Sequence, residues 1–144
     1  MYHASPIKPN QEGSHAVTSY GSVRRSRWSF PATAPALAAT AQPFNDAVFV
    51  EAQRAGKPIF VAIHASWCPI CKAQTPILAQ LMADPKFKDL VYLTIDFDSQ
   101  KDLVRRFGAR MQSTLISFKG ATEQARSVGD TNRQSIAALL NKVL

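Results

Sequence analysis

The stretch Lys57–Pro76 reads KPIFVAIHASWCPICKAQTP and combines an apolar run, a break and the start of a helix. The run Ile59–Ile63 predicts a buried β-strand, and Cys68 then falls in the first turn of the helix. Cys71 follows three residues later, so both sulfur atoms lie on one helix face, a turn apart. Free N–H groups at a helix N-terminus favour a thiolate at Cys68, and Pro69 suits that turn because it has no N–H to leave unpaired. The stretch therefore predicts a reversible dithiol with Cys68 as the attacking sulfur and Cys71 as the resolving one.

Composition limits what else the chain can be. It has 144 residues, 46% of them apolar and 19% charged, which is enough for one domain with a hydrophobic core. The two cysteines are the pair just described, so a framework of structural disulfides and a four-cysteine zinc site are both excluded. The net charge of +7 is spread along the chain, without basic runs interleaved with aromatic residues. We therefore expect no nucleic-acid partner.

Residues 1–43 predict a disordered leader or an export signal. Residues 1–22 are polar and without period, and a basic cluster with Arg24 and Arg25 precedes a mildly apolar stretch that ends in an A-x-A pattern. This is the layout of a secretory signal, with the arginine pair of a twin-arginine signal and cleavage after Ala39 or Ala41. We expect export to the periplasm, the alternative being a cytoplasmic protein with an Ala/Pro-rich leader. No run reaches the roughly 18 apolar residues of a membrane span, so we expect no integral membrane protein.

The rest of the chain, residues 44–144, alternates helix and strand patterns and predicts one domain. Strand–helix–strand units favour parallel pairing, and a final hairpin adds an antiparallel edge. The expected fold is a three-layer α/β/α arrangement around a mixed four-stranded sheet. The predicted helices are 46–55, 69–83, 100–107 and 131–143, and the predicted strands are 58–63, 90–96, 114–118 and 123–128. The core-facing stripe of the second helix is predicted to comprise Ile70, Ala73, Ile77, Leu78 and Leu81.

The sequence W-C-P-I-C-K at residues 67–72 resembles the W-C-x-x-C-K signature of the thioredoxin-like thiol–disulfide oxidoreductases. Pro76 falls where that family carries a helix-kinking proline, and the resemblance extends from about Phe44 to Leu144. It implies the thioredoxin-like fold and disulfide exchange with protein substrates through Cys68 and Cys71, without an organic cofactor. We expect Trp67 to lie over the site as a lid. We expect it, together with Pro69 and Ile70, to contact the substrate or to tune the redox potential of the cysteine pair.

The chain also departs from the family pattern. Ser113 stands where the family has a cis-proline before the strand-start Thr114. A cis bond before a non-proline residue costs about 2.5–4 kcal/mol, so we expect the bond between Gln112 and Ser113 to be trans. The backbone of Ser113 could keep the pairing with substrate, and its hydroxyl could hydrogen-bond a thiolate or admit a metal ion. The remaining alternative is that Ser113 is a tolerated substitution in a loop. Gly129 matches a family glycine that allows close backbone approach near the site.

A second departure concerns proton transfer at Cys71. Many thioredoxins place a buried Asp and a Lys under the resolving cysteine, and the matching positions here are Ala62 and Tyr92. Water, a substrate group or His64 must then take the proton. His64 has three open interpretations: packing beside Trp67, lowering the pKa of the thiolate, or joining both cysteines in a soft-metal site.

Two functions follow from these residues. The first is a thiol–disulfide oxidoreductase, which we expect to be a monomer. With export we expect it to work in the reducing direction, because Gly56-Lys57-Pro58 resembles the lead-in of envelope disulfide reductases. Its partners are protein disulfides and a membrane or soluble thiol donor. The alternative is a copper-binding module that uses Cys68, Cys71 and possibly His64. Asp96 and Asp98 are interpreted as ordinary loop polarity after a strand.

Overall fold

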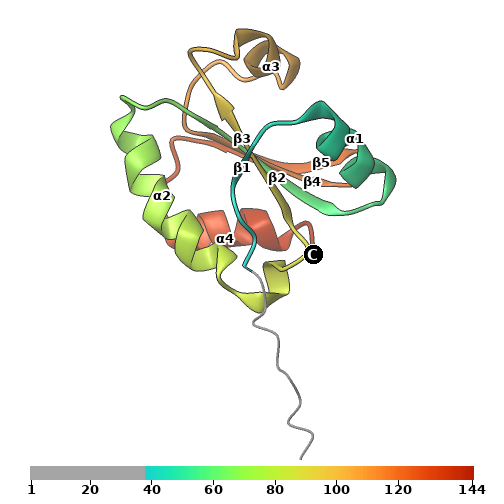
Figure 1. Ribbon diagram of the computed structural model, residues 1–144. Coiled ribbons are helices and arrows are strands. Elements are labelled where there is room, and N and C mark those ends of the chain that lie inside the picture. Colours follow the sequence, from blue (N-terminus) through green and yellow to red (C-terminus); the bar gives the residue numbers. More distant parts are fainter. Residues whose placement is uncertain (1–37) are drawn as a thin grey trace, which may run out of the picture. The chain divides into compact units, whose positions relative to one another are not determined.

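The computed structural model describes residues 38–144, in which a mixed sheet carries helices on both faces (Figure 1). Residues 1–37 of the predicted leader or export signal, which spans residues 1–43, lie outside the described residues. The sheet order is β1-β3-β2-β4-β5, with β1, β3 and β2 parallel and the β2–β4 and β4–β5 pairs antiparallel. The strands are β1 (Gln42–Pro43), β2 (Pro58–His64), β3 (Val91–Asp96), β4 (Thr114–Lys119) and β5 (Thr122–Val128). The helices are α1 (Asp46–Arg54), α2 (Pro69–Met82), α3 (Lys101–Arg106), α4 (Arg133–Asn141) and the 3₁₀ turn η1 (Pro85–Phe87).

The central strand β2 is buried because both of its faces are covered. Its side chains alternate, as in any strand, so that Val61 and its i±2 neighbours pack with α1 and α3, while Phe60 and Ala62 pack with α2 and α4. Figure 1 shows these two helix pairs on opposite faces of the sheet. The three-layer α/β/α prediction is confirmed, and it explains why β2 is a continuous apolar run rather than an alternating one.

The sheet has five strands, so the prediction of four was wrong. The additional strand β1 consists of Gln42 and Pro43, immediately before the predicted domain, and pairs in parallel with β3. Phe44 N–H donates to the Thr94 carbonyl oxygen at 2.9 Å, and the Thr94 hydroxyl donates to the Gln42 carbonyl oxygen at 3.2 Å. Two residues that include a proline give no strand pattern, and Pro43 is tolerated because β1 is an edge strand.

The described helices are short, and none is long and apolar enough to cross a bilayer in this part of the chain. Asn45 begins α1 by accepting the N–H of Val48 on its side-chain oxygen at 3.1 Å. Gly56 follows the helix with a φ of +65°, a conformation that favours glycine, and the chain then turns into β2. Asn45 and Gly56 thus mark the two ends of α1, and Gly56 sets where the chain turns into β2.

Candidate active site

The two cysteines lie where β2 ends and α2 begins. Cys68 is the N-cap residue of α2, with extended backbone angles (φ −79°, ψ 112°), and Pro69 is the first helical residue. Cys68 and Cys71 form a disulfide with their Cα atoms 5.3 Å apart. The Cys71 N–H donates to Cys68 Sγ at 3.1 Å. In the reduced protein, this N–H and the positive end of the helix favour a thiolate at Cys68.

Both cysteines are nearly inaccessible in the disulfide form: Cys68 is 1% exposed and Cys71 is 7% exposed. They form a small cluster with Ala65, against which Phe97 packs. By contrast, four of the five large hydrophobic residues that are exposed within residues 38–144 lie in segments next to the pair. These are Trp67, Ile70, Met111 and Val128, which we call the apolar rim.

The rim comes from three stretches of chain that meet beside the disulfide. Trp67 and Ile70 flank Cys68 in sequence. Gly129, next to Val128, is so close to α2 that a Cβ atom on it would lie 3.9 Å from Ile70 Cδ1. Met111 and Val128 line the same small pocket of about 280 Å³. Exposed apolar side chains grouped in this way are typical of an interaction surface rather than of scattered surface residues.

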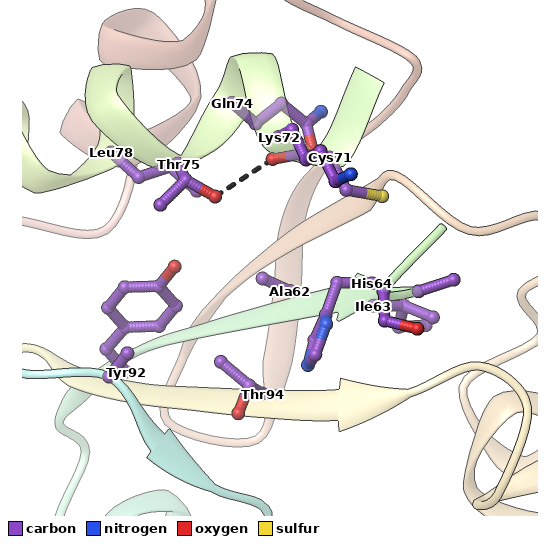
Figure 2. Close-up of a pocket in the computed structure, with 13 residues that line it drawn as sticks. Ala62, Ile63, His64, Cys71, Lys72, Gln74, Thr75, Leu78, Tyr92 and Thr94 are labelled. Carbon is purple, nitrogen blue, oxygen red and sulfur yellow. Dashed lines mark hydrogen bonds between the residues drawn. The ribbon is translucent and has the colours of Figure 1, made fainter. Parts of the chain in front are cut away.

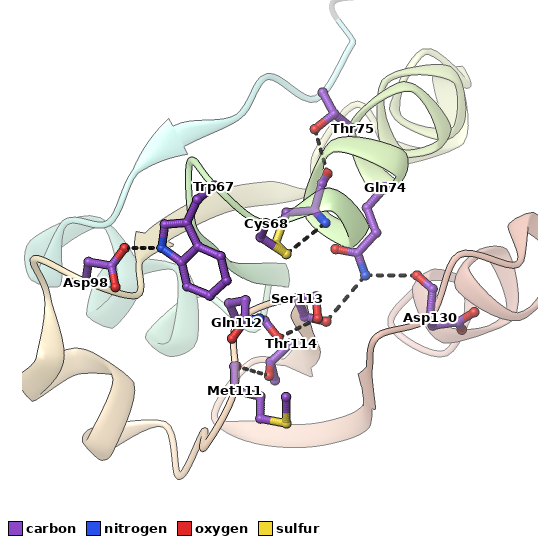
Figure 3. The surroundings of a disulfide bond; sticks show 11 residues. Trp67, Cys68, Gln74, Thr75, Asp98, Met111, Gln112, Ser113, Thr114 and Asp130 are labelled. Atoms are coloured by element: carbon purple, nitrogen blue, oxygen red, sulfur yellow. Dashed lines mark hydrogen bonds between the residues drawn. A yellow bond between two sulfur atoms is a disulfide. The ribbon is translucent and has the colours of Figure 1, made fainter.

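Trp67 is held in place by Asp98, a residue that we had interpreted as ordinary loop polarity. The indole Nε1–H donates to Asp98 Oδ2 at 2.7 Å (Figure 3). Asp96 shapes the same loop, because its carboxylate accepts the N–H of Ser99 at 2.8 Å, the Ser99 hydroxyl at 2.8 Å and the Asp98 N–H at 3.0 Å. These bonds, led by the Ser99 N–H, lower the pKa of Asp96 below its ordinary 3.8.

Ser113 lies beside the disulfide in an unusual backbone conformation. Its φ of +59° makes it the only non-glycine residue with positive φ in the described part of the chain. The same residues contain no cis peptide bond, so the link from Gln112 to Ser113 is trans, as expected. The Ser113 hydroxyl donates to the Gln112 carbonyl oxygen, and the Thr114 hydroxyl donates to the Met111 carbonyl oxygen at 2.6 Å. Both hydroxyls therefore brace their own loop, and that of Ser113 is not directed to a sulfur.

Gly129 meets this loop from the other side. Its φ is +69°, and its N–H donates to the Ser113 carbonyl oxygen at 3.0 Å. The bond extends the β4–β5 pairing by one step beyond the Thr114–Val128 pair. The Ser113 loop and the Gly129 turn thus form one bonded unit at the end of the sheet.

A pocket of about 340 Å³ opens on the other side of Cys71 (Figure 2). Ala62 and Tyr92, the positions where many thioredoxins carry a buried Asp and a Lys, both line it. No carboxylate is among its lining residues, and His64 is the imidazole that faces it together with Cys71. Burial raises the pKa of Tyr92 to about 12, so the phenol stays neutral at ordinary pH and cannot serve as the base for Cys71.

The soft-metal alternative has no support in the structure. Within residues 38–144, no three His, Cys, Asp or Glu side chains are grouped so that they could hold a metal ion. A site made of Cys68, Cys71 and His64 is therefore not formed, and the copper-binding function is not supported.

Gln74 is a site residue that the sequence analysis missed. The predicted stripe of α2 had Ile70 and Ala73 facing the core, but both are exposed, and Gln74 is buried with 3% exposure. Its side-chain Nε2 donates to the carbonyl oxygens of Ser113 and Asp130 (Figure 3). The signal that could have revealed it is its spacing of three residues from Cys71, the buried cysteine of the same helix.

Comparison with known proteins agrees with this geometry. The family model described as Thioredoxin matches residues 35–142 of the chain. The thioredoxin of Chlamydia muridarum (strain MoPn / Nigg) is 34% identical over 84 residues, which cover 58% of this chain and 80% of that relative. The thioredoxin of Pseudomonas aeruginosa is 31% identical over 88 residues, 61% of this chain and 81% of the relative. The crystal structure of Trxlp from Edwardsiella tarda EIB202 is 38% identical with a TM-score of 0.68, and the match covers 70% of this chain and 98% of that one.

The pocket beside Cys71 leads to a prediction about Tyr92. Because its folded-state pKa is raised from 10.0 to about 12, the neutral phenol stabilises the fold below pH 10, and this contribution is lost as the pH rises from 10 to 12. The difference in tyrosinate absorbance between the wild type and Tyr92→Phe should therefore titrate with a midpoint near 12. The subtraction removes the signals of Tyr2 and Tyr20, and a midpoint near 10 would contradict the burial argument.

Proposed function

The chain belongs to the thioredoxin family and is a thiol–disulfide oxidoreductase, and on that premise we propose that it reduces disulfides in protein clients through Cys68 and Cys71. The observation that carries the proposal is the placement of Cys68 as the N-cap of α2, where the Cys71 N–H donates to its sulfur. In the reduced protein this arrangement favours a thiolate at Cys68 over one at Cys71, which distinguishes the nucleophile from the resolving thiol.

The reaction consists of two exchanges. The Cys68 thiolate attacks one sulfur of the client disulfide, a mixed disulfide forms, and the other client sulfur leaves as a thiolate that takes up a proton. Cys71 then loses its proton and attacks Cys68 Sγ, which releases the second client sulfur as a thiolate. Two electrons pass to the client, and the protein is left with the Cys68–Cys71 disulfide seen in the structure.

The proton of Cys71 leaves by a route unlike the buried Asp–Lys relay of many thioredoxins. Cys71 faces the pocket of about 340 Å³, which contains Ala62 and Tyr92 in place of that relay. We assign proton acceptance to water in this pocket and to His64, because His64 lines the pocket together with Cys71 and no carboxylate does. Tyr92 is neutral there and does not take the proton.

The apolar rim supports a protein client rather than a small disulfide. A client that lies across Trp67, Ile70, Met111 and Val128 covers four exposed hydrophobic side chains at once. Trp67 and Ile70 stand on either side of Cys68 in the sequence, so a client sulfur that reaches Cys68 comes close to the rim. Contact with the rim therefore selects clients that present a cysteine on a partly apolar surface.

The direction of electron flow predicts the redox potential of the cysteine pair. In the reducing direction the Cys68–Cys71 pair has a potential near that of thioredoxin, about −270 mV. Metal-free protein is equilibrated against a dithiothreitol series, and its thiol content is measured at each point. A potential near −120 mV, typical of a strong disulfide donor, would contradict the reducing direction.

The roles of the two cysteines give the second prediction. Cys71→Ser should accumulate a covalent mixed disulfide between Cys68 and a client, because the resolving thiolate is missing. The adduct appears on a non-reducing gel and disappears with dithiothreitol. The matched variant Cys68→Ser should form none, and equal adduct yields from both variants would show that the roles are assigned wrongly.

We further propose that the protein is exported and is re-reduced by a thiol donor at the membrane or in solution. The support is the signal-like layout before residue 42 and the position of β1, which begins at Gln42. Cleavage after Ala39 or Ala41 removes no described strand or helix.

Export predicts a mature N-terminus at Thr40 or Gln42 in the periplasmic fraction of a Gram-negative host that expresses the full chain. Mass spectrometry of the purified protein identifies that residue. Recovery in the cytoplasmic fraction with residues 1–41 intact would rule out this part of the proposal.

A further inference from the structure

Gln74 is the buried polar side chain that connects the cysteine helix to the rest of the site. It lies one turn after Cys71 on α2 and is 3% exposed. A buried amide without partners is costly, whereas here Nε2 donates to the Ser113 carbonyl oxygen at 3.3 Å and to the Asp130 carbonyl oxygen at 2.9 Å. One side chain thereby ties α2 to both segments of the bonded unit that the Ser113 loop and the Gly129 turn form.

The position of these two loops relative to α2 depends in part on this tie, whereas the loops are joined to each other by the bond from the Gly129 N–H. The Ser113 carbonyl oxygen accepts both Gln74 Nε2 and the Gly129 N–H, which occupies its two lone pairs. Ser113 also holds a positive φ that only surrounding contacts can maintain in a residue other than glycine. Gln74 supplies one of these contacts from the same helix that carries Cys71.

The tethered loops carry half of the apolar rim. Met111 precedes Ser113 by two residues, and Val128 precedes Gly129 by one. Both side chains are more than half exposed, at 52% and 54%. The distance from these side chains to the cysteine pair is therefore set in part by the two hydrogen bonds of Gln74.

We infer that Gln74 is a positioning residue for protein clients: by holding the Ser113 loop and the Gly129 turn against α2, it aligns the rim with Cys68 and so favours protein disulfides over small ones. An apolar residue of similar size fills the same space but donates no hydrogen bond, so the amide itself is what the inference requires. The inference rests on the proposed function, because it concerns the client surface of that reaction.

The test compares two substrates for the variant Gln74→Met, which keeps an unbranched side chain of similar length and removes the donor. Insulin serves as the protein disulfide and 2-hydroxyethyl disulfide as the small one. We expect kcat/KM for insulin to fall at least tenfold further than kcat/KM for the small disulfide, mainly through KM. Equal losses on both substrates, or no loss on insulin, would overturn the inference.

The matched control is Gln80→Met, the same change at an exposed position of the same helix, where the side chain accepts a bond from Arg133. It should show no selective loss on insulin, and a selective loss equal to that of Gln74→Met would overturn the inference. If the wild type itself fails to reduce insulin, the proposed function fails, which is a different result from a wild type that is active but unaffected by Gln74→Met.

A second variant, Gln74→Glu, keeps the inference testable should Gln74→Met not fold. A carboxyl group donates a hydrogen bond only when protonated, and then through a single O–H, so protonation restores one of the two bonds. The rate of Gln74→Glu with insulin, relative to the wild type, should therefore recover in part as the pH falls. The relative rate with 2-hydroxyethyl disulfide should not follow the same profile. A pH-independent ratio on insulin would contradict a role for the donated hydrogen bonds.

Discussion

The burial of β2 between β3 and β4 is the constraint from which the site follows. Because this strand is covered on both faces and paired on both edges, its end at His64 is firmly placed, and the start of α2 follows it closely in the chain. Cys68 occupies that point as the N-cap of α2, so the sulfur receives an N–H and the positive end of a helix. The chemistry of the cysteine pair is thus a consequence of where the central strand stops.

The other parts of the site are brought to this point by the same sheet. The loop after β3 supplies Asp98 to hold Trp67, and the segment before β4 supplies the braced Ser113 loop. The turn after β5 supplies Gly129, whose N–H reaches the Ser113 carbonyl oxygen. The Trp67–Asp98 and Gly129–Ser113 bonds join residues that are far apart in sequence, and the segments that they hold lie around two cysteines that are almost fully buried.

The departures from the family pattern have different structural outcomes. A trans bond and a positive φ at Ser113 replace the cis-proline, and hydroxyls and a glutamine amide stabilise the loop instead of a rigid ring. At the positions of the Asp–Lys relay, Ala62 and Tyr92 leave a pocket beside Cys71 in which burial keeps the phenol neutral. The nucleophile is therefore placed as the pattern predicts, while the resolving cysteine has different surroundings.

The sequence by itself determined the order of the main strands and helices, the position of the cysteine pair at a helix start and the family to which the chain belongs. These are local properties: apolar periodicity, capping residues and the spacing of two cysteines are visible within a few residues. Only the tertiary structure decided that Gln42–Pro43 forms an edge strand, that Asp98 holds Trp67 and that Gln74 is buried. A two-residue strand, a loop carboxylate and a helical glutamine look like ordinary surface features in sequence, because their partners lie dozens of residues away and are chosen by packing.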